Sequence, residues 1–482
     1  MVRFNRALLV FPSFKNDLGS ARPSPSIAYL AQALKEAGIE YDVMDMSLGY
    51  TFDDLKTKIA SFKPEMLGFT IFTLNHKTVF KMLEKLKDAF PEIKLLVGGP
   101  HVSIFGVEIL QKFQAIDYVC VGEGEDLIVE LCTGKDIHTI KGLGFREGTK
   151  THFSGTRPYK DNLDELRFPK LERFKLKKYA GEILIISSRG CPYSCIYCSV
   201  SLVLGKKVRI RSTKDVVDEI EYWYQKGRRI FNFFEDNFTF YKDRVYAICG
   251  EIEKRNLKGL TLRASNGVRA DRLDYDLLKR MKEVGFKSIG IGVEAGNDNI
   301  LKTLKKGETI TQIESTIKNA CDLGYEVALF FVVGTPGETW QDIEDSIRIA
   351  LKYRIFKVDF YNLIPFPGTE LYGWVNQHNA WLGDPEELLN SSGKNIRFGS
   401  KPFFATEALP YATRVRLSKR LLKVMRKVEI NYFKQLFRKK IGFLAGYPLA
   451  YLMATAFMQR LYFNNNKFRK IAEKIRYFLI SK

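Results

Sequence analysis

The sequence lacks the features that a secreted, disulfide-stabilised protein requires. Only seven of its 482 residues are cysteine. Four of these are scattered and form no framework of paired spacings. Residues 1–6 lead straight into a short apolar run with no small-residue cleavage site after it, so we expect no signal peptide. These absences favour a reducing, cytoplasmic setting. The scattered cysteines are Cys120, Cys132, Cys249 and Cys321.

Acidic residues are scarce at the C-terminal end of the chain. From Tyr411 onward there are 18 Lys and Arg but only two acids, Glu429 and Glu473. This segment carries +16 of the net charge of +21, and the preceding residues are close to neutral. Because the charge belongs to one segment, it does not indicate a nucleic-acid-binding body, and we expect no nucleic-acid partner.

The other three cysteines lie close together in residues 190–198, Gly-Cys-Pro-Tyr-Ser-Cys-Ile-Tyr-Cys. Three thiolates at Cys191, Cys195 and Cys198 can bind three irons of a [4Fe–4S] cluster, which normally takes four cysteines. The fourth iron is then open to a ligand that is not protein. A disulfide would leave one cysteine over, and a structural zinc site would need a fourth ligand, for which the nearest preceding histidine is His152.

The C-x3-C-x2-C spacing, with Tyr197 before the last cysteine, resembles the radical S-adenosylmethionine (radical SAM) superfamily. The resemblance implies that the SAM amino and carboxylate groups chelate the open iron. An electron from the cluster then splits SAM and forms a 5′-deoxyadenosyl radical. It further implies that Tyr197 lies near the adenine, and that a reducing partner such as flavodoxin or ferredoxin supplies the electron.

Residues 1–145 alternate short apolar runs with helical patterns. This alternation predicts an α/β domain with a doubly wound, Rossmann-like parallel sheet, whose ligands bind at the carboxyl ends of the strands. The predicted strands are residues 7–11, 41–45, 66–70, 94–99 and 117–121, and the predicted helices are 26–37, 52–62 and 79–90.

Two segments of this domain, residues 97–101 (Val-Gly-Gly-Pro-His) and 121–125 (Val-Gly-Glu-Gly-Glu), resemble the cobalamin-binding domain that precedes many radical SAM domains. Neither His76 nor His101 lies in the Asp-x-His-x-x-Gly pattern that ligates cobalt in other cobalamin proteins. The radical SAM branch commonly lacks that pattern too. A sheet domain that has lost its cofactor is the alternative. The resemblance assigns cobalamin to Thr70, Gly98, Gly99, Gly122 and Glu123.

Residues 146–180 are polar and interrupted by prolines, and we interpret them as a connector with some local hairpin structure. Strand–helix alternation then resumes in residues 181–400, which we predict to be the radical SAM domain. Six such units fit a partial (β/α)6 barrel with its active site at the carboxyl ends of the strands. The cysteine loop follows the first of these strands. The predicted strands are residues 183–186, 229–234, 260–264, 288–293, 327–333 and 357–363.

Polar residues at these strand ends are candidates for binding SAM, because its ammonium group calls for carboxylate or amide acceptors. Residues 235–237 stand where the superfamily has a Gly-Gly-Glu-type motif. Residues 292–296 resemble its Gly-Ile-Glu-Ser-Gly segment, and residues 334–338 resemble its segment facing the adenine. Helix capping is the alternative for the acids. We assign no catalytic residue beyond the cluster ligands. The SAM candidates are Tyr197, Glu235, Asp236, Asn237, Ser265, Arg269 and Glu294.

Residues 401–482 are predicted to be a basic helical region. Residues 414–428 form an amphipathic pattern with Leu417, Leu421, Val424, Met425 and Val428 on one face. Residues 441–459 carry no charged side chain but are interrupted by glycines and a proline. Three alternatives remain open: a helix in the membrane interface, helices packed on the barrel, and a spanning helix. The first would place the protein at the inner membrane face.

These features lead to one predicted function and several alternatives. We expect a cobalamin-dependent enzyme resembling class B radical SAM methyltransferases, acting on an unactivated carbon by methyl transfer. The substrate is a small molecule, and the basic tail favours a lipid or isoprenoid. Cyclisation, rearrangement and C–C bond formation are alternatives. A transfer-RNA methylthiotransferase would need a further three-cysteine cluster, and an iron–sulfur electron carrier would not need the strand-end acids.

Overall fold

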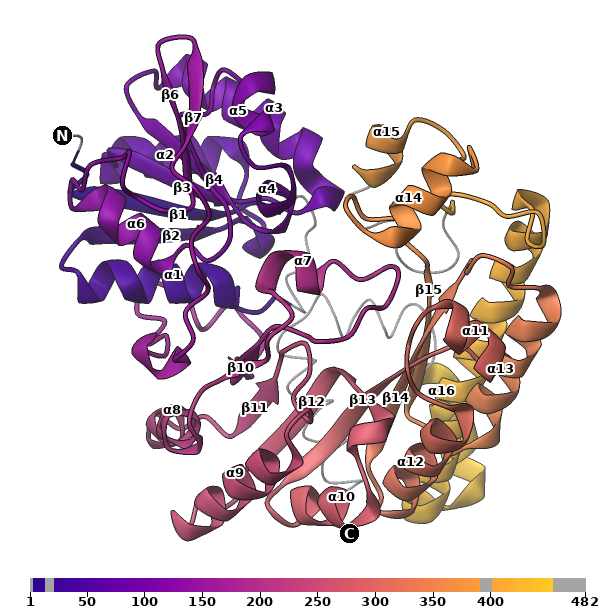
Figure 1. Cartoon of the computed structure of the whole chain (residues 1–482). Helices are drawn as coiled ribbons and strands as arrows, with labels where there is room; N and C mark the ends of the chain where they lie inside the picture. The colour runs from indigo at the N-terminus through magenta and orange to yellow at the C-terminus, as the bar shows by residue number, and fades with distance from the viewer. Residues whose placement is uncertain (1–2, 14–20, 391–400, 454–482) are drawn as a thin grey trace. The chain divides into compact units, whose positions relative to one another are not determined.

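The computed structural model describes residues 3–13, 21–390 and 401–453 (Figure 1). The chain divides into two compact units. Unit 1 comprises Met1–Tyr179, Ser199–Arg209 and Glu386–Gly393. Unit 2 comprises Ala180–Cys198, Ile210–Pro385 and Lys394–Lys482. Each unit has its own central sheet, and the two are described separately.

The sheet of unit 1 has seven strands in the order β2-β1-β3-β4-β5-β6-β7. The first five are parallel, whereas β6 and β7 are antiparallel to their neighbours. The strands are β1 (Arg6–Phe11), β2 (Glu40–Asp45), β3 (Met66–Thr70), β4 (Lys94–Gly98), β5 (Tyr118–Cys120), β6 (Leu143–Glu147) and β7 (Lys150–Phe153). The helices are α1 (Pro25–Glu36), α2 (Phe52–Phe62), α3 (His76–Ala89), α4 (Pro100–Phe105), α5 (Glu108–Lys112), α6 (Glu125–Cys132) and α7 (Val200–Leu204), with short 3-10 turns η1 (Met46–Leu48), η2 (Thr73–Asn75) and η3 (Leu163–Glu165).

Alternate residues of β1 face opposite sides of this sheet, as the two-residue period of a strand requires. Ala7 and Leu9 join the core beneath α1 and α6. Leu8 and Val10 join the core formed with α2, α3 and α5. Helices therefore cover both faces (Figure 1), and the predicted doubly wound parallel sheet is confirmed.

The antiparallel extension by β6 and β7 was not predicted as part of this sheet. Residues 143–153 form a hairpin that pairs with β5, so the sheet continues past residue 145. The side chains of β7 are partly or fully exposed. An exposed edge strand lacks the apolar alternation by which a strand is recognised in a sequence.

The main sheet of unit 2 has six parallel strands in chain order, β8-β11-β12-β13-β14-β15. Within the described residues β8 and β15 do not pair, so the sheet is open, which confirms the predicted partial barrel. Its strands are β8 (Ile183–Ile185), β11 (Ile230–Phe233), β12 (Thr261–Val268), β13 (Phe286–Glu294), β14 (Glu326–Val333) and β15 (Lys357–Asn362); β9 (Ser188–Arg189) and β10 (Arg209–Ile210) are two-residue strands.

Helices between these strands begin where the sequence provides capping residues. The Ser212 side chain accepts a hydrogen bond from the Asp215 N–H, and Thr309 and Thr339 form capping boxes. The helices of unit 2 are α8 (Thr213–Gln225), α9 (Lys242–Lys254), α10 (Tyr275–Glu283), α11 (Asp298–Thr303), α12 (Ile310–Asp322), α13 (Trp340–Lys352), α14 (Glu370–Gln377) and α16 (Tyr411–Met453), with the 3-10 turn η4 (Ala270–Arg272). Helix α15 (Pro385–Leu389) belongs to unit 1 from Glu386 onward.

Helix α16 packs against α13 and β15 within unit 2. Four of the five residues of the predicted apolar face are buried, and the fifth, Met425, is partly buried; the four are Leu417, Leu421, Val424 and Val428. For this stretch the structure supports the packed-helix alternative, and the buried face is unavailable to a lipid surface. The uncharged run 441–459 extends past residue 453, so its end lies outside the described residues. No helix in the described part of the chain combines the length and apolar character that a bilayer crossing requires.

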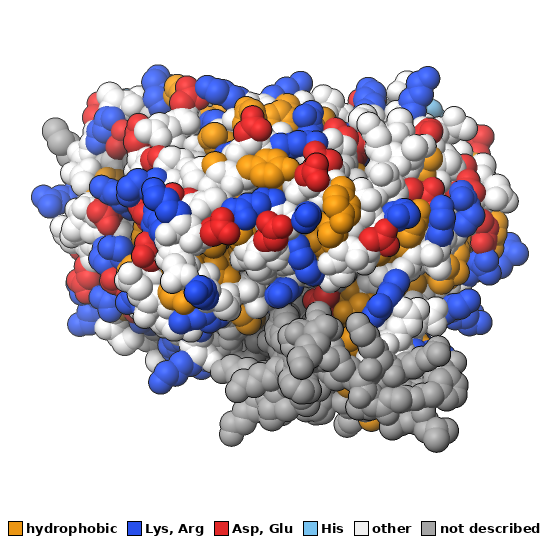
Figure 2. All heavy atoms as spheres, turned by 90° about the horizontal axis from the view of Figure 1, so that it is seen from below, with side chains coloured by type: hydrophobic (Ala, Val, Ile, Leu, Met, Phe, Trp, Pro, Cys, Tyr) orange, Lys and Arg blue, Asp and Glu red, His pale blue; other side chains and the backbone are white. Residues whose placement is uncertain are grey.

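Charged side chains of both signs lie interspersed on the face drawn in Figure 2. Lys and Arg alternate there with Asp and Glu, and apolar side chains occur in small groups among them. On this face the described residues show no single-sign patch, as expected for a chain whose net charge is concentrated at one end.

The packing of α16 can be tested with two neighbouring leucines. Leu421 is 0% exposed and Leu422 is 46% exposed. We expect Leu421→Ala to lower the free energy of unfolding by about 2 to 5 kcal/mol, because it leaves a cavity. Leu422→Ala should change it by less than about 0.5 kcal/mol. Urea unfolding of the two variants measures both values, and equal effects would contradict the packing of this face.

Candidate functional site

The cysteine loop lies between β9 and α7, in a stretch without regular secondary structure. Ile196, at its middle, is buried, and its N–H donates to the carbonyl of Leu304 at 3.2 Å. Its own carbonyl accepts from the N–H of Leu371 at 2.9 Å. A further turn bond joins the Cys198 N–H to the Cys195 carbonyl at 3.1 Å. The three thiols are therefore presented by a loop whose backbone is fixed on two sides.

The residues that enter the loop are held by a buried carboxylate. Glu235 accepts from the Ser187 hydroxyl at 2.5 Å, from the Ser187 N–H at 3.1 Å and from the Ser188 hydroxyl at 2.5 Å. From the other direction, Arg244 donates to the Ser187 carbonyl at 2.7 Å and Arg211 donates to the Ile186 carbonyl at 3.0 Å. The Glu235 carboxylate is thus occupied by protein donors, and in this structure it orders the loop.

The thiols are partly buried and lie near two cations. Burial raises the pKa of Cys191 and of Cys195, because it disfavours the thiolate. Lys306 and Arg269 act in the opposite direction on the pKa of both thiols. A thiolate that binds iron carries negative charge, so these cations favour the form that a cluster requires.

Lys306 and Glu308 form a buried network that the sequence analysis did not identify. The Lys306 ammonium lies 3.2 Å from Glu294 Oε1 and 3.3 Å from Glu308 Oε2. Arg269 donates to the Lys306 carbonyl at 2.6 Å, and Glu308 accepts from the Ala270 N–H at 2.6 Å. Residues 305–308 have the charged composition of an exposed loop, so no sequence pattern indicates that Lys306 turns inward.

Glu294 ends β13 with its backbone in the left-handed region, at φ 67°. The bulge between Gly292 and Glu294 turns its carboxylate back along the strand. A Cβ at Gly292 would lie 2.7 Å from Glu294 Oε1, so a side chain there would displace this carboxylate. The carboxylate also lies near Tyr197, whose pKa is raised well above its ordinary value by burial and by Glu294. A backbone outlier of this kind is typical of functional sites.

Asn237 has buried polar atoms without protein partners, and its neighbour Asp236 is partly buried. Asn237 is 2% exposed, and neither its Oδ1 nor its Nδ2 has a hydrogen-bond partner among the described residues. Burial, with Glu235 nearby, raises the pKa of Asp236 to about 6. Buried polar groups are nearly always hydrogen-bonded, so this pair indicates a place for a polar ligand.

Two other predicted SAM residues are already engaged by the protein. The Ser265 hydroxyl donates to Asn232 Oδ1 at 2.7 Å. The Arg269 guanidinium lies 3.6 Å from the centre of the Tyr193 ring and pairs with Asp271 at 3.0 Å. The structure therefore brings the predicted residues to one region of unit 2 and leaves the side chain of Asn237 without protein partners.

The donor set fits a cluster better than a single metal ion. Among the described residues, no three His, Cys, Asp or Glu side chains converge closely enough to bind one ion. A cubane cluster does not require its three thiolates to converge on one ion, because each thiolate binds a different iron. The structural zinc alternative lacks its fourth ligand here.

In unit 1, the predicted cobalamin residues lie at the carboxyl ends of β3, β4 and β5. Gly99 has φ 95°, and a Cβ there would lie 2.5 Å from Thr70 Oγ1 and 3.0 Å from the Ile71 N–H nitrogen. Gly122 has φ 87° and open space where a side chain would begin. These glycines leave bare backbone at the strand ends, which suits the close approach of a large ligand.

Glu123 differs from the other predicted cobalamin residues. Both its carboxylate oxygens accept from Arg209, at 2.8 and 2.9 Å, and it also accepts from the Lys160 N–H at 3.0 Å. Arg209 is buried. The Glu123 carboxylate therefore holds Lys160 and Arg209 at the end of β5 through these hydrogen bonds.

The two histidines of this region stack on each other. His76 and His101 lie 4.7 Å apart between ring centres, and both are buried. Burial, with His76 beside it, lowers the pKa of His101 to about 3. His76 donates through Nδ1 to the Thr73 carbonyl at 2.6 Å. The pair is neutral and packed against Phe80 and Phe105.

Comparison with known proteins matches both units. The radical SAM superfamily model matches residues 185–350, and the B12 binding domain model matches residues 17–132. An uncharacterized methyltransferase of Pyrococcus horikoshii is 30% identical over 393 residues, covering 78% of this chain and 84% of the relative. The chain belongs to the cobalamin-dependent radical SAM methyltransferase family.

Two further similarities describe the breadth of this family. The anaerobic magnesium-protoporphyrin IX monomethyl ester cyclase of Cereibacter sphaeroides is 25% identical over 391 residues, covering 76% of this chain and 63% of the relative. The radical SAM methyltransferase TsrM from Kitasatospora setae has the same fold, with a TM-score of 0.69 at 18% identity, covering 98% of this chain and 99% of that structure.

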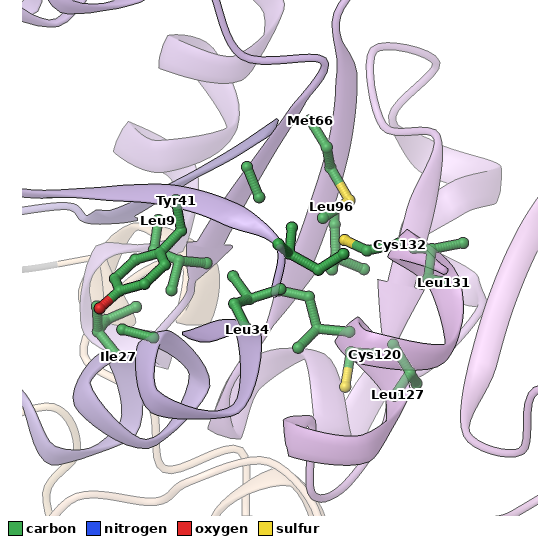
Figure 3. Packing of buried hydrophobic residues seen from close by; sticks show 14 of the residues in the cluster. Leu9, Ile27, Leu34, Tyr41, Met66, Leu96, Cys120, Leu127, Leu131 and Cys132 are labelled. Atoms are coloured by element: carbon green, nitrogen blue, oxygen red, sulfur yellow. The ribbon is translucent and has the colours of Figure 1, made fainter. Parts of the chain in front are cut away.

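Cys120 and Cys132 are buried core residues of unit 1. All seven cysteines lie in the described part of the chain, and none forms a disulfide. Figure 3 shows Cys120 and Cys132 among Leu34, Leu96, Leu127 and Leu131. Burial raises the pKa of each of these thiols to about 12. They do not supply the further three-cysteine cluster that the methylthiotransferase alternative requires.

Proposed function

We propose that this chain binds a [4Fe–4S] cluster, SAM and cobalamin, and transfers a methyl group from SAM to an unactivated carbon of a small molecule. The observation that carries the proposal is the three-thiol loop together with Asp236 and the unsatisfied Asn237, in a chain that also has a B12 binding domain. The cluster would supply the electron that cleaves SAM, and cobalamin would supply a methyl carrier.

In unit 2, Cys191, Cys195 and Cys198 would hold the cluster through their thiolates. Asp236 would accept a hydrogen bond from the SAM ammonium. Asn237 can both donate to the SAM carboxylate and accept from the ammonium. Lys306 and Arg269 would offset the negative charge gathered at the thiolates. Tyr197 and Glu294 border the same region, whereas Glu235 and Ser265 position the backbone of the loops.

In unit 1, Thr70, Gly98, Gly99 and Gly122 would line the cobalamin site, and Glu123 would hold its rim together through Arg209. The neutral His76–His101 pair is consistent with a site that places no histidine on cobalt, because both rings are packed within the protein. The electron would come from a partner such as flavodoxin or ferredoxin, in a reducing cytoplasm.

Cyclisation is a second candidate, and the similarity to the magnesium-protoporphyrin ester cyclase favours it. The two reactions differ in what they do to SAM. Methyl transfer converts SAM to S-adenosylhomocysteine, whereas radical cleavage yields 5′-deoxyadenosine. Cyclisation requires only the second product.

The cluster assignment predicts the effect of single cysteine substitutions. Cys191→Ser, Cys195→Ser and Cys198→Ser should each lower the iron content below the expected value of about four per chain. Each should also reduce 5′-deoxyadenosine formation under dithionite to background. Cys321→Ser is the matched control, because its side chain donates to the Arg354 carbonyl at 3.4 Å and a serine can keep that bond. A Cys195→Ser variant with normal iron and normal SAM cleavage would defeat the assignment.

The reaction type can be tested before the substrate is identified. We expect the reconstituted protein, incubated with reduced cobalamin and SAM, to form about one S-adenosylhomocysteine per chain in a single turnover. Chromatography of the nucleoside products measures this yield. Formation of 5′-deoxyadenosine with no S-adenosylhomocysteine would favour cyclisation instead.

The cobalamin assignment predicts that Gly99→Ala weakens cobalamin retention by at least about tenfold, because the new Cβ meets Thr70 at the end of β3 and the Ile71 backbone after it. Gly148→Ala is the control: it has a positive φ of 59°, but nothing lies within 4 Å of its Cβ. Corrin absorbance after desalting measures retention. Wild-type protein without corrin absorbance would remove the assignment, as would equal retention by the two variants.

A further inference from the structure

The C-terminal helix reaches into the strand ends of unit 2 through one arginine. Arg414, in the first turn of α16, is 2% exposed. Its guanidinium donates to the Phe404 carbonyl at 2.7 Å, to the Val333 carbonyl at 2.8 Å and to Asn362 Oδ1 at 3.1 Å. Val333 and Asn362 are the last residues of β14 and β15. A single side chain of α16 therefore bridges the carboxyl ends of two neighbouring strands.

The turn after β14 is shaped around this guanidinium. Gly334 has φ 110°, and a Cβ there would lie 2.6 Å from Arg414 Nη1 and 2.9 Å from its Cζ. Any side chain at this position would displace Arg414, so glycine is required both by the backbone and by the contact. The Arg414 guanidinium therefore packs directly against the backbone of Gly334.

The opposite side of the same turn is held by Glu338. Its carboxylate accepts from the Gly334 N–H at 2.6 Å and from the Thr335 N–H at 3.2 Å. Burial raises the pKa of Glu338 to about 7, and Arg414 acts against that rise. Thr335 therefore sits in a turn that is fixed by the Glu338 carboxylate, just before α13, and by Arg414 of α16.

The hydroxyl of Thr335 has no hydrogen-bond partner among the described residues, although the residue is 0% exposed. It lies within residues 334–338, the segment whose sequence resembles the adenine-facing segment of radical SAM proteins. A buried hydroxyl without a partner is rare, and its orientation depends on the backbone that carries it. The turn therefore carries a hydroxyl without a hydrogen-bond partner on a backbone that Glu338 and Arg414 hold in place.

We propose that Arg414 is a positioning residue for SAM: it fixes the β14–α13 turn from α16, so that the C-terminal helix is a working part of the nucleotide site. This inference rests on the proposed function. Arginine suits the role because its planar fork of five donors can serve three acceptors at once, which the single ammonium of lysine cannot do in the same geometry. The helix that the sequence marks as a basic tail thereby contributes to the active domain.

The test compares Arg414→Met and Arg414→Lys with Arg420→Met in the full-length, anaerobically reconstituted protein. Arg420 lies on the same helix, is 49% exposed and pairs with Glu344 at 2.6 Å. We expect Arg414→Met to raise the Kd for SAM at least about tenfold at unchanged iron content. Arg414→Lys should be intermediate and Arg420→Met should match the wild type. The KM for SAM should rise more than kcat falls.

Other outcomes would overturn the inference. Wild-type SAM affinity in Arg414→Met contradicts it, and so does a parallel loss of iron and SAM, which would show a general folding role. If Arg414→Met does not fold, Arg414→Lys decides alone, because it keeps the charge and removes the planar fork; unchanged SAM affinity there also contradicts the inference. A wild-type protein that holds its cluster but binds no SAM would refute the proposed function rather than this role.

Discussion

The hydrogen bonds of Ile196 fix the cysteine loop at its middle, and the geometry of the site depends on them. Its N–H and carbonyl bind Leu304 and Leu371, which lie far along the chain. The entrance of the loop is fixed separately, by Glu235 and Arg244. A loop of thiols without such anchors would lose conformational entropy each time it bound a cluster. Here much of that cost is met on folding, so the thiols are arranged in advance.

Charged side chains are buried around this loop in an arrangement that the stability of the fold does not require. Lys306 pairs with Glu294 and Glu308, and Arg269 donates to the backbone beside them. Removing charges from water costs several kcal/mol per ion, about as much as their attraction returns. Such networks persist where a site needs fixed charges in place. The strained backbone of Glu294 belongs to the same network and supports this interpretation.

The alternation of strands and helices was predictable from the sequence, because buried strands and amphipathic helices leave clear periodic patterns. Helix α2 and strand β3 begin and end where the pattern predicts. The burial of Lys306 and the hydrogen bonds of Arg414 to the ends of β14 and β15 were not predictable. Both residues stand in charged stretches that are typical of a solvated surface, and only tertiary packing decides which charged side chain turns inward. The engagement of Glu235 by Ser187 and Ser188 was hidden for the same reason, since the three residues are joined only by the fold.

The central claim is that three thiolates leave one iron open for SAM. Electron–nuclear double resonance of the reduced cluster, with SAM labelled with ¹⁵N at its amino group, tests this most directly. We expect a hyperfine coupling between the labelled nitrogen and the cluster. This coupling should be absent with unlabelled SAM and weaker in the Asn237→Ala variant. An intact, reduced cluster that binds SAM without any such coupling would contradict it.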